Sequence, residues 1–305
     1  MSWTRRLRIH HLQLLISLSE TGSLSETAKQ LFTTQPGLSK WLKELEDDIG
    51  AELFDRHSRG LQPTAMGRLL IAHAERVINE MDRAEINLAS LKEGSSRTLA
   101  IGTSPATAPT FVPAAIIQFI EKHPESRIEI QEGTMNILLE KLETGKLDLV
   151  VGRMDNYQPR STLFSEMLYK ESLSIVARID HPLAGKPALS WADLYNYDWI
   201  VWPSGTPIRS KLDISLTTAG QKPPPYRIES TSQVGNLWLL QFSDMLSIVS
   251  ERVARHFHER GLITALDIEL QGEQGSVGMC WRDEVPLDDA MSDLLACFRQ
   301  AVKQV

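Results

Sequence analysis

The chain has 305 residues, of which 42% are hydrophobic and 23% charged, and its formal net charge is -7. This composition excludes an intrinsically disordered chain and provides enough apolar residues for two or three packed units. No apolar run approaches the roughly 18 residues that a membrane span requires, and the first residues, MSWTRRLRIHHLQ, lack the apolar stretch of a secretory signal. We therefore expect a soluble, cytoplasmic protein with no membrane partner.

Charge is distributed unevenly along the chain. Residues 1–64 carry eight basic and eight acidic side chains, whereas residues 94–305 carry 20 basic and 26 acidic ones. A nucleic-acid binder requires a basic contact face rather than a basic chain. The overall acidity therefore does not exclude DNA binding by one part of the protein.

Residues 22–31, GSLSETAKQL, predict the first of two closely linked helices. Ser23 and Glu26 have the spacing of a capping box, and Ala28 and Leu31 are expected to face inward. Only three residues separate this helix from the next one. Two helices joined by so short a turn predict a helix-turn-helix unit, whose second helix enters the major groove of DNA.

The second helix is predicted over residues 34–49, with Thr34 as its N-cap and Pro36 in its first turn. Apolar residues at steps of four, three and four predict its buried face: Leu38, Leu42, Leu45 and Ile49. The opposite side carries Pro36, Ser39, Lys40 and Lys43. Free N–H groups, a hydroxyl, an amide side chain and lysines at one helix end suit an anionic, hydrogen-bonding surface such as duplex DNA.

Residues 51–64, AELFDRHSRGLQPT, predict a basic wing after this helix. Leu53 and Phe54 are expected to anchor the segment in the core. The loop that follows carries Arg56 and Arg59 and is placed to reach the DNA backbone or the minor groove.

Residues 65–93 form one long helical pattern that spans close to 40 Å, more than a small domain needs. Apolar residues recur along it at three- and four-residue steps: Met66, Leu70, Val77, Met81, Ala84, Leu88 and Leu91, with His73 in the same register. This seam predicts a dimerisation helix, and the alternative is a core helix of a single domain.

From residue 94 onward, short β-rich runs alternate with helical patterns. The predicted strands cover residues 99–102, 128–130, 148–152, 173–177, 199–202, 246–250 and 277–281. The alternation predicts parallel sheets covered by helices, which is the doubly wound α/β class. About 210 residues are enough for two such subdomains.

Residues 22–74 resemble the DNA-binding segment of LysR-type transcriptional regulators. The portions TQPGLSK, LE-DIG-ELFDR and QPTAMG carry the match in one continuous run. The resemblance implies a winged helix-turn-helix domain over residues 1–64, a dimerising linker helix over 65–93 and an effector-binding domain over 94–305. That last domain would consist of two α/β lobes resembling periplasmic binding proteins.

The resemblance implies that the chain passes from lobe I to lobe II and back again within the C-terminal region. Lobe I would comprise about residues 97–167 and 269–305, and lobe II about residues 168–268. The chain departs from the family pattern at Gly37 and Trp41. We expect Trp41 either to pack against the wing or to stack on the sugar-phosphate backbone.

The resemblance also assigns DNA contacts. Base edges or nearby phosphates would be met by Gln35, Pro36, Ser39 and Lys40. Thr34 would cap the helix, Lys43 would extend its basic side, and Arg56 and Arg59 would serve the wing. The chemistry agrees, because Gln can pair with adenine, Lys with guanine or phosphate, and Ser with any base.

Three polar segments follow predicted strands and precede helices: residues 103–105, 204–207 and 230–232. In open α/β sheets, ligands bind at the carboxyl ends of the strands, where helix N-termini offer N–H groups. These segments predict an anion-friendly cleft, and Arg153 would supply one full charge to a carboxylate or phosphate.

By the resemblance, the effector lies between the two lobes. The matching positions are Thr103, Ser104, Thr134, Arg153, Trp202, Pro203, Ser204, Thr231 and Ser232. We expect a small organic acid or a sugar derivative, with Trp202 and Trp238 either stacking on it or packed in the core. The family further implies a contact with RNA polymerase and a homotetramer, although a dimer stays open.

The sequence disfavours two other classes of protein. An enzyme is disfavoured because GxSxG, HExxH, P-loop and complete GxGxxG motifs are absent, and His256 and His258 lie close together without a third ligand or a nucleophile. Cys280 and Cys297 show no metal-ligand spacing and should be small buried residues. We therefore predict no catalytic residue, metal or cofactor. A periplasmic solute-binding protein would explain two lobes but not residues 1–93.

Overall fold

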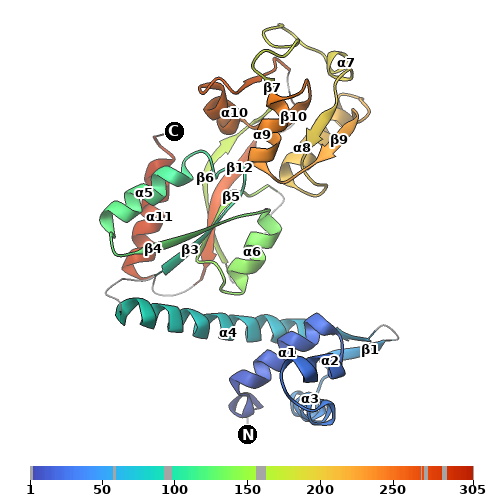
Figure 1. Ribbon diagram of the computed structural model, residues 1–305, viewed down its shortest axis with the longest axis vertical. Coiled ribbons are helices and arrows are strands. Elements are labelled where there is room, and N and C mark those ends of the chain that lie inside the picture. The colour runs from blue at the N-terminus through green and yellow to red at the C-terminus, as the bar shows by residue number, and fades with distance from the viewer. Residues whose placement is uncertain are drawn as a thin grey trace. The chain divides into compact units, whose positions relative to one another are not determined.

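The computed structural model describes residues 3–57, 60–92, 98–155, 163–268, 270, 274–283 and 287–304 (Figure 1). The chain divides into two compact units, each of which is described by itself. The first unit comprises residues 1–94 with 143–146, and the second comprises residues 95–142 with 147–305. Within the described ranges, no helix combines the length and the apolar character that a membrane crossing requires.

The first unit is mainly helical. Its elements are η1 Trp3–Arg6, α1 Ile9–Thr21, α2 Leu24–Gln30, α3 Gln35–Ile49, β1 Phe54–His57, β2 Gly60–Pro63 and α4 Ala65–Lys92. The strands β1 and β2 form an antiparallel hairpin in which Phe54 lies opposite Pro63. The predicted helix-turn-helix, wing and long helix are therefore confirmed.

One core joins these elements. Buried side chains from α1, α3, β1, β2 and α4 form it together with Leu53: Leu15, Leu18, Leu42, Leu45, Leu53, Phe54, Leu61 and Ile71. The Glu46 carboxylate accepts hydrogen bonds from the N–H groups of Leu53 and Phe54, at 2.7 and 3.2 Å. The start of α4 crosses so close to this segment that a Cβ at Gly67 would overlap the carbonyl oxygen of Leu53. The wing and the long helix are thus fixed to α3.

The second unit contains two five-stranded sheets. The first has the order β4-β3-β5-β12-β6. Its strands are β3 Thr98–Thr103, β4 Arg127–Glu132, β5 Leu149–Arg153, β6 Leu163–Glu171 and β12 Gly275–Arg282, and its helices are α5 Val112–Lys122, α6 Met135–Glu143 and α11 Asp289–Ala301.

The second sheet has the order β11-β7-β10-β8-β9. Its strands are β7 Leu173–Arg178, β8 Trp199–Val201, β9 Tyr226–Glu229, β10 Leu246–Ser250 and β11 Ile263–Ala265. The helices in this part of the chain are α7 Trp191–Leu194, α8 Pro207–Thr218, α9 Gln233–Gln241 and α10 Glu251–His258.

The predicted two-lobed α/β class is confirmed, but both sheets are mixed, so the expectation of parallel sheets holds for only part of each sheet. β3 pairs in parallel with β4 and β5, but β12 runs antiparallel to β5 and β6. In the second sheet β7 runs antiparallel to β10 and β11. The chain passes from one sheet to the other between β6 and β7 and returns between β11 and β12. These strands therefore do not follow a crossover helix within one sheet, which is the connection that parallel neighbours need.

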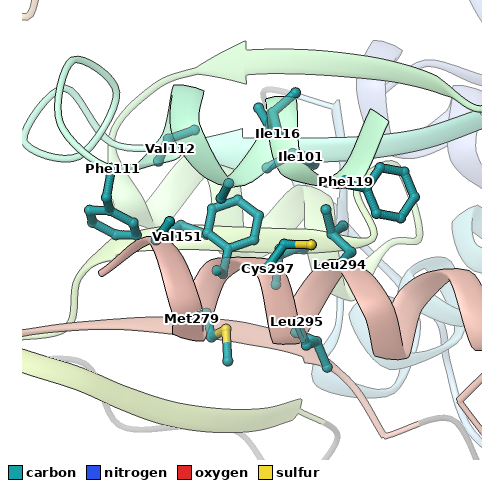
Figure 2. Close-up of a cluster of buried hydrophobic side chains, with 14 of the residues drawn as sticks. Ile101, Phe111, Val112, Ile116, Phe119, Val151, Met279, Leu294, Leu295 and Cys297 are labelled. Carbon is teal, nitrogen blue, oxygen red and sulfur yellow. The ribbon is translucent and has the colours of Figure 1, made fainter. Parts of the chain in front are cut away.

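Strand alternation gives each sheet two buried faces. In β5, Leu149 and Val151 pack against α5 and α11, whereas Val150 between them packs against α6. Figure 2 shows the first of these clusters, which contains Phe111, Phe119 and Cys297. Both cysteines are free and buried as predicted, and burial raises the pKa of the Cys280 thiol to about 12.

Candidate functional sites

The N-terminal end of α3 is built as the sequence predicts. The Thr34 hydroxyl caps the helix by accepting a hydrogen bond from the Gly37 N–H at 3.3 Å, and Pro36 occupies the first turn. Leu38, Leu42 and Leu45 are buried on the opposite side. The outward side of α3 presents Gln35, Pro36, Lys40 and Lys43 as exposed residues and Ser39 as a half-buried one. This surface combines polar and basic side chains, whereas Pro36 has no N–H and the N–H of Gly37 is used by the cap.

Gly37 and Trp41 have local explanations. A Cβ at Gly37 would lie 2.9 Å from the capping hydroxyl of Thr34, so a larger residue would disturb the cap. Trp41 packs within the unit, with its ring 5.0 Å from that of His11 in α1. Of the two alternatives for Trp41, packing within the protein is therefore present. Trp41 lies against His11 of α1 and against the core cluster that contains Phe54 and Leu61 of the wing.

The wing is anchored to the end of α1. The N–H of Leu61 in β2 donates a hydrogen bond to the carbonyl oxygen of Gly22 at 2.8 Å. Arg56 in β1 is exposed and lies opposite Leu61 in the hairpin. Arg59, the second predicted wing residue, lies outside the described residues. One basic side chain of the wing is therefore placed at the surface of this unit.

A small cavity in the second unit is lined by the ends of strands from both sheets and by the starts of two helices. Its volume is about 40 Å³. It is lined by residues at the ends of β3, β4, β5 and β8 and at the start of α6 and α8: Ser104, Pro105, Ala106, Gly133, Thr134, Met135, Arg153, Trp202, Thr206, Pro207 and Ile208. The carboxyl ends of strands and the N-termini of helices meet here, as the sequence predicted.

Four predicted effector residues line this cavity, namely Ser104, Thr134, Arg153 and Trp202. The other predicted residues do not line it: Thr103, Pro203, Ser204, Thr231 and Ser232. Thr103 is buried with its hydroxyl 2.9 Å from that of Thr107, and Ser232 caps α9 by accepting a hydrogen bond from the Gly235 N–H. These two hydroxyls therefore serve the local fold.

The two tryptophans have different surroundings. Trp202 belongs to the core of the second sheet, and its indole N–H donates to the carbonyl oxygen of Ile248 at 3.0 Å. Trp238 is 53% exposed on α9 and stacks on Phe242 at 6.0 Å between ring centroids. Trp238 is neither among the cavity residues nor buried in the core, so it matches neither of the two alternatives.

Sequence reasoning missed the apolar lining of the cavity and the partners of Arg153. Met135 and Ile208 follow helix starts and have the same apolar character as ordinary core residues. The predicted polar segment 204–207 does contribute to the lining, through Thr206 and Pro207 at the start of α8. Asp155 lies only two residues from Arg153 and was not recognised as its partner, whereas Glu171 meets Arg153 only through the tertiary fold.

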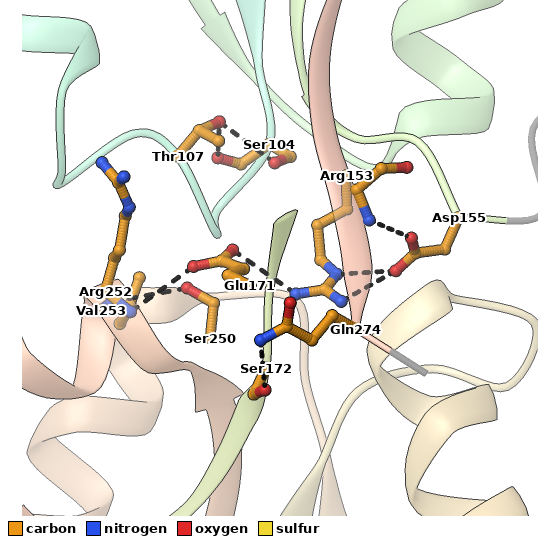
Figure 3. Close-up of polar contacts among 11 residues, drawn as sticks. Ser104, Thr107, Arg153, Asp155, Glu171, Ser172, Ser250, Arg252, Val253 and Gln274 are labelled. Atoms are coloured by element: carbon orange, nitrogen blue, oxygen red, sulfur yellow. Dashed lines mark hydrogen bonds and ion pairs between the residues drawn. The ribbon is translucent and has the colours of Figure 1, made fainter. Parts of the chain in front are cut away.

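Arg153 is not a free cation, which corrects the expectation that it offers an uncompensated charge. Its guanidinium is 3% exposed and donates to Asp155 Oδ2 from Nε at 3.0 Å and from Nη2 at 2.8 Å. Nη1 donates to Glu171 Oε1 at 3.4 Å (Figure 3). A Cβ at Gly275 would overlap the guanidinium, so glycine is required beside it. Two carboxylates thus fix the orientation of Arg153 and compensate its charge.

Glu171 should make the stability of the protein depend on pH. Burial raises the pKa of its carboxyl above the ordinary 4.5, although Arg153 and the N–H of Arg252 oppose the shift. The folded state therefore holds this proton more strongly than the unfolded state does. The stabilisation by the protonated form is complete below pH 4.5 and is lost as the pH rises through the raised folded pKa.

The measurement is a comparison of wild type with Glu171→Gln by urea unfolding at several pH values. The free energy of unfolding of wild type, relative to the variant, should fall as the pH rises from 4.5 and then level off. A difference that rises with pH over this range would contradict the raised pKa.

A helix-turn-helix with an outward polar helix end, a long helix and a two-sheet α/β unit with a cavity together define an effector-responsive DNA-binding regulator. Two family models match the chain: "Bacterial regulatory helix-turn-helix protein, lysR family" over residues 9–68 and "LysR substrate binding domain" over residues 92–303. The chain belongs to the LysR family of transcriptional regulators, which are not enzymes.

Relatives and solved structures agree with this assignment. The chain is 32% identical to the HTH-type transcriptional regulator GbpR of Azospirillum brasilense over 97% of this chain and 87% of the relative. It is 30% identical to GalR of Pseudomonas putida, over 96% and 74%. The structure of CbnR, a LysR family transcriptional regulator, has a similar fold, with a TM-score of 0.62, 19% identity and coverage of 97% and 100%.

Proposed function

We propose that α3 reads a promoter site with two-fold symmetry and that the second unit adjusts this binding when a small molecule occupies its cavity. The observation that carries the proposal is the exposed, capped end of α3, with Gln35 and Lys40 exposed and Ser39 half-buried on its outward side. Gln35, Pro36, Ser39 and Lys40 would meet bases or adjacent phosphates. Thr34 would cap the helix, and Lys43, Arg56 and Arg59 would contact the phosphate backbone of DNA.

A dimer in which two chains pair through α4 would present two copies of α3 to DNA. The apolar seam of α4 is exposed at Met66, Val77, Met81 and Leu88. Beside it lies an apolar cavity of about 460 Å³, bounded by η1, α1, α3 and α4. Such a surface on one chain fits a second copy of the same helix. On α9, the exposed Trp238–Phe242 pair offers a further apolar surface for assembly into a homotetramer.

The cavity near Arg153 is proposed as the effector site. Its lining favours a small organic acid or a sugar derivative, because it combines hydroxyls, helix N-termini and apolar side chains. The charge of Arg153 is already compensated by Asp155 and Glu171, which favours an uncharged or singly charged molecule over a multiply charged one. At about 40 Å³ the cavity is much smaller than a typical ligand pocket.

Binding would therefore require the walls of the cavity to separate, and this movement would couple the effector to the DNA-bound state. We further propose that the protein acts in the cytoplasm and contacts RNA polymerase at the promoter. A footprint on the DNA upstream of its own coding sequence tests the scheme. Two protected half-sites about one or more helical turns apart, altered by a panel of small acids and sugars, are expected.

Gln35→Ala and Ser39→Ala test the proposed base contacts. Each should weaken binding to the protected site by about 5- to 150-fold, because a lost base contact costs about 1–3 kcal/mol. Binding to unrelated duplex DNA should change much less, since phosphate contacts remain. Lys43→Ala is the matched comparison and should weaken both kinds of binding alike. If Gln35→Ala and Ser39→Ala weakened binding to the protected site and to unrelated DNA equally, as Lys43→Ala should, then Gln35 and Ser39 would contact only the DNA backbone.

A further inference from the structure

The turn between α2 and α3 holds an aromatic residue in a conformation that suits glycine. Phe32 has a φ of 51°, in the left-handed region. The Thr33 N–H donates to the carbonyl oxygen of Ala28 at 2.9 Å, and the Phe32 N–H donates to that of Lys29 at 3.4 Å. This pair of bonds is the Schellman ending of a helix, and it places Phe32 at the position where glycine predominates.

The other two helix ends of the helix-turn-helix follow the usual rule. α1 is followed by Gly22 with a φ of 61°, and α3 is followed by Gly50 with a φ of 77°. A side chain with a Cβ is strained in this conformation, so phenylalanine costs free energy that glycine would not. The backbone alone therefore does not explain the residue at position 32.

Packing does not explain it either. The Phe32 side chain is 98% exposed, the most exposed of the large hydrophobic residues in the described part of the chain. Leu31 beside it is half-buried against the small core that contains Ala28 and Leu38, and that core does not include Phe32. The ring is therefore presented to solvent at a cost in strain and without a gain from burial.

Phe32 lies close in sequence to the DNA-reading end of α3. Phe32 lies two residues before the cap Thr34 and three before Gln35, the first residue of α3. Its backbone is fixed by the same turn that positions this helix. Phe32 is thus close in sequence to Gln35 and Pro36, which are exposed, and Lys29, one turn earlier in α2, is exposed as well.

We propose that Phe32 is a further DNA-contact residue, whose ring packs on apolar surface of the duplex beside the site of α3. This inference rests on the proposed DNA contact of α3. Duplex DNA offers two such surfaces, the faces of the deoxyribose rings and the C5-methyl groups of thymine. Burial of the ring in the complex stabilises the bound state and accounts for a phenylalanine where folding favours glycine.

The test uses the full chain with two variants that remove the ring, Phe32→Gly and Phe32→Asn, since both residues tolerate the left-handed conformation. Thermal unfolding should occur at the same or a higher temperature than in wild type. Affinity for the upstream DNA should fall by about 5- to 50-fold, as expected for the loss of a partly buried aromatic contact. The dependence of affinity on salt should stay unchanged, because no charge is removed.

Operator DNA with deoxyuridine in place of single thymidines distinguishes the two surfaces. If deoxyuridine at one position lowers the affinity of wild type but not that of Phe32→Gly, the ring contacts the methyl group of that thymine. If no replacement lowers the affinity of wild type, the ring contacts deoxyribose. Wild-type affinity in both variants overturns the inference while leaving the proposed function intact. A changed oligomeric state in the variants also overturns it, because the ring would then contact protein. Failure of wild type to bind any duplex at low salt overturns both proposals.

Discussion

Replacing Arg153 with methionine should lower the free energy of unfolding of the second unit by about 3–5 kcal/mol. Its guanidinium is buried between Asp155 and Glu171. Without it, the Glu171 carboxylate would remain buried with a smaller set of partners. Removal of one partner from a buried ion pair leaves an uncompensated charge, and this cost exceeds the net value of the intact pair.

Urea unfolding of the full chain followed by tryptophan fluorescence is a suitable measurement, because five of the seven tryptophans lie in this unit: Trp191, Trp199, Trp202, Trp238 and Trp281. Arg178→Met is the matched control. It removes a half-exposed ion pair with Asp244 at 2.8 Å and should cost no more than about 1 kcal/mol. Combining Arg153→Met with Glu171→Leu should recover part of the loss. Equal effects of Arg153→Met and the control would contradict the buried network.

Leu38→Ala should destabilise the first unit by about 2–5 kcal/mol, the range for a buried leucine replaced by alanine. Leu38 is 1% exposed and packs with Leu14 of α1 and Ala28 of α2, so it connects all three helices. Loss of this contact leaves a cavity beneath the first turn of α3. We therefore expect weaker binding to specific and to unrelated DNA, in contrast to Gln35→Ala.

Hydrogen exchange of peptides from residues 9–50 measures this effect locally. Amides of α3 that exchange by unfolding of the unit should exchange about 30-fold faster or more. Asp47→Ala, an exposed change on the same helix, should alter stability by no more than about 0.5 kcal/mol. Protection unchanged in Leu38→Ala would show that Leu38 does not support α3.

Local sequence signals were sufficient for the first unit because its elements follow rules that act over a few residues. The spacing of Leu38, Leu42 and Leu45 and the cap at Thr34 define α3 from the sequence alone. The same reasoning did not identify Trp41's partner or the strain at Phe32. Packing neighbours and backbone angles at a turn are not encoded in residue spacing.

In the second unit, strong apolar runs predicted seven strands, but β6, β9 and β11 were missed. β6 lies at the edge of its sheet and is buried only at its two ends, Leu163 and Glu171, and β11 has only three residues. Their β character depends on the neighbouring strands that they pair with. The direction of β12 was also not predictable, because it depends on where the chain returns to the first sheet.

The sequence by itself determined the helix-turn-helix, the long apolar seam, the alternation of strand and helix and the family to which the chain belongs. The tertiary structure decided which polar side chains share the cavity and that the charge of Arg153 is already compensated. The physical reason is one of range. Caps and periodic faces form between residues a few positions apart, whereas Arg153 and Glu171 are separated by 18 positions and meet only when β5, β6 and β12 pair.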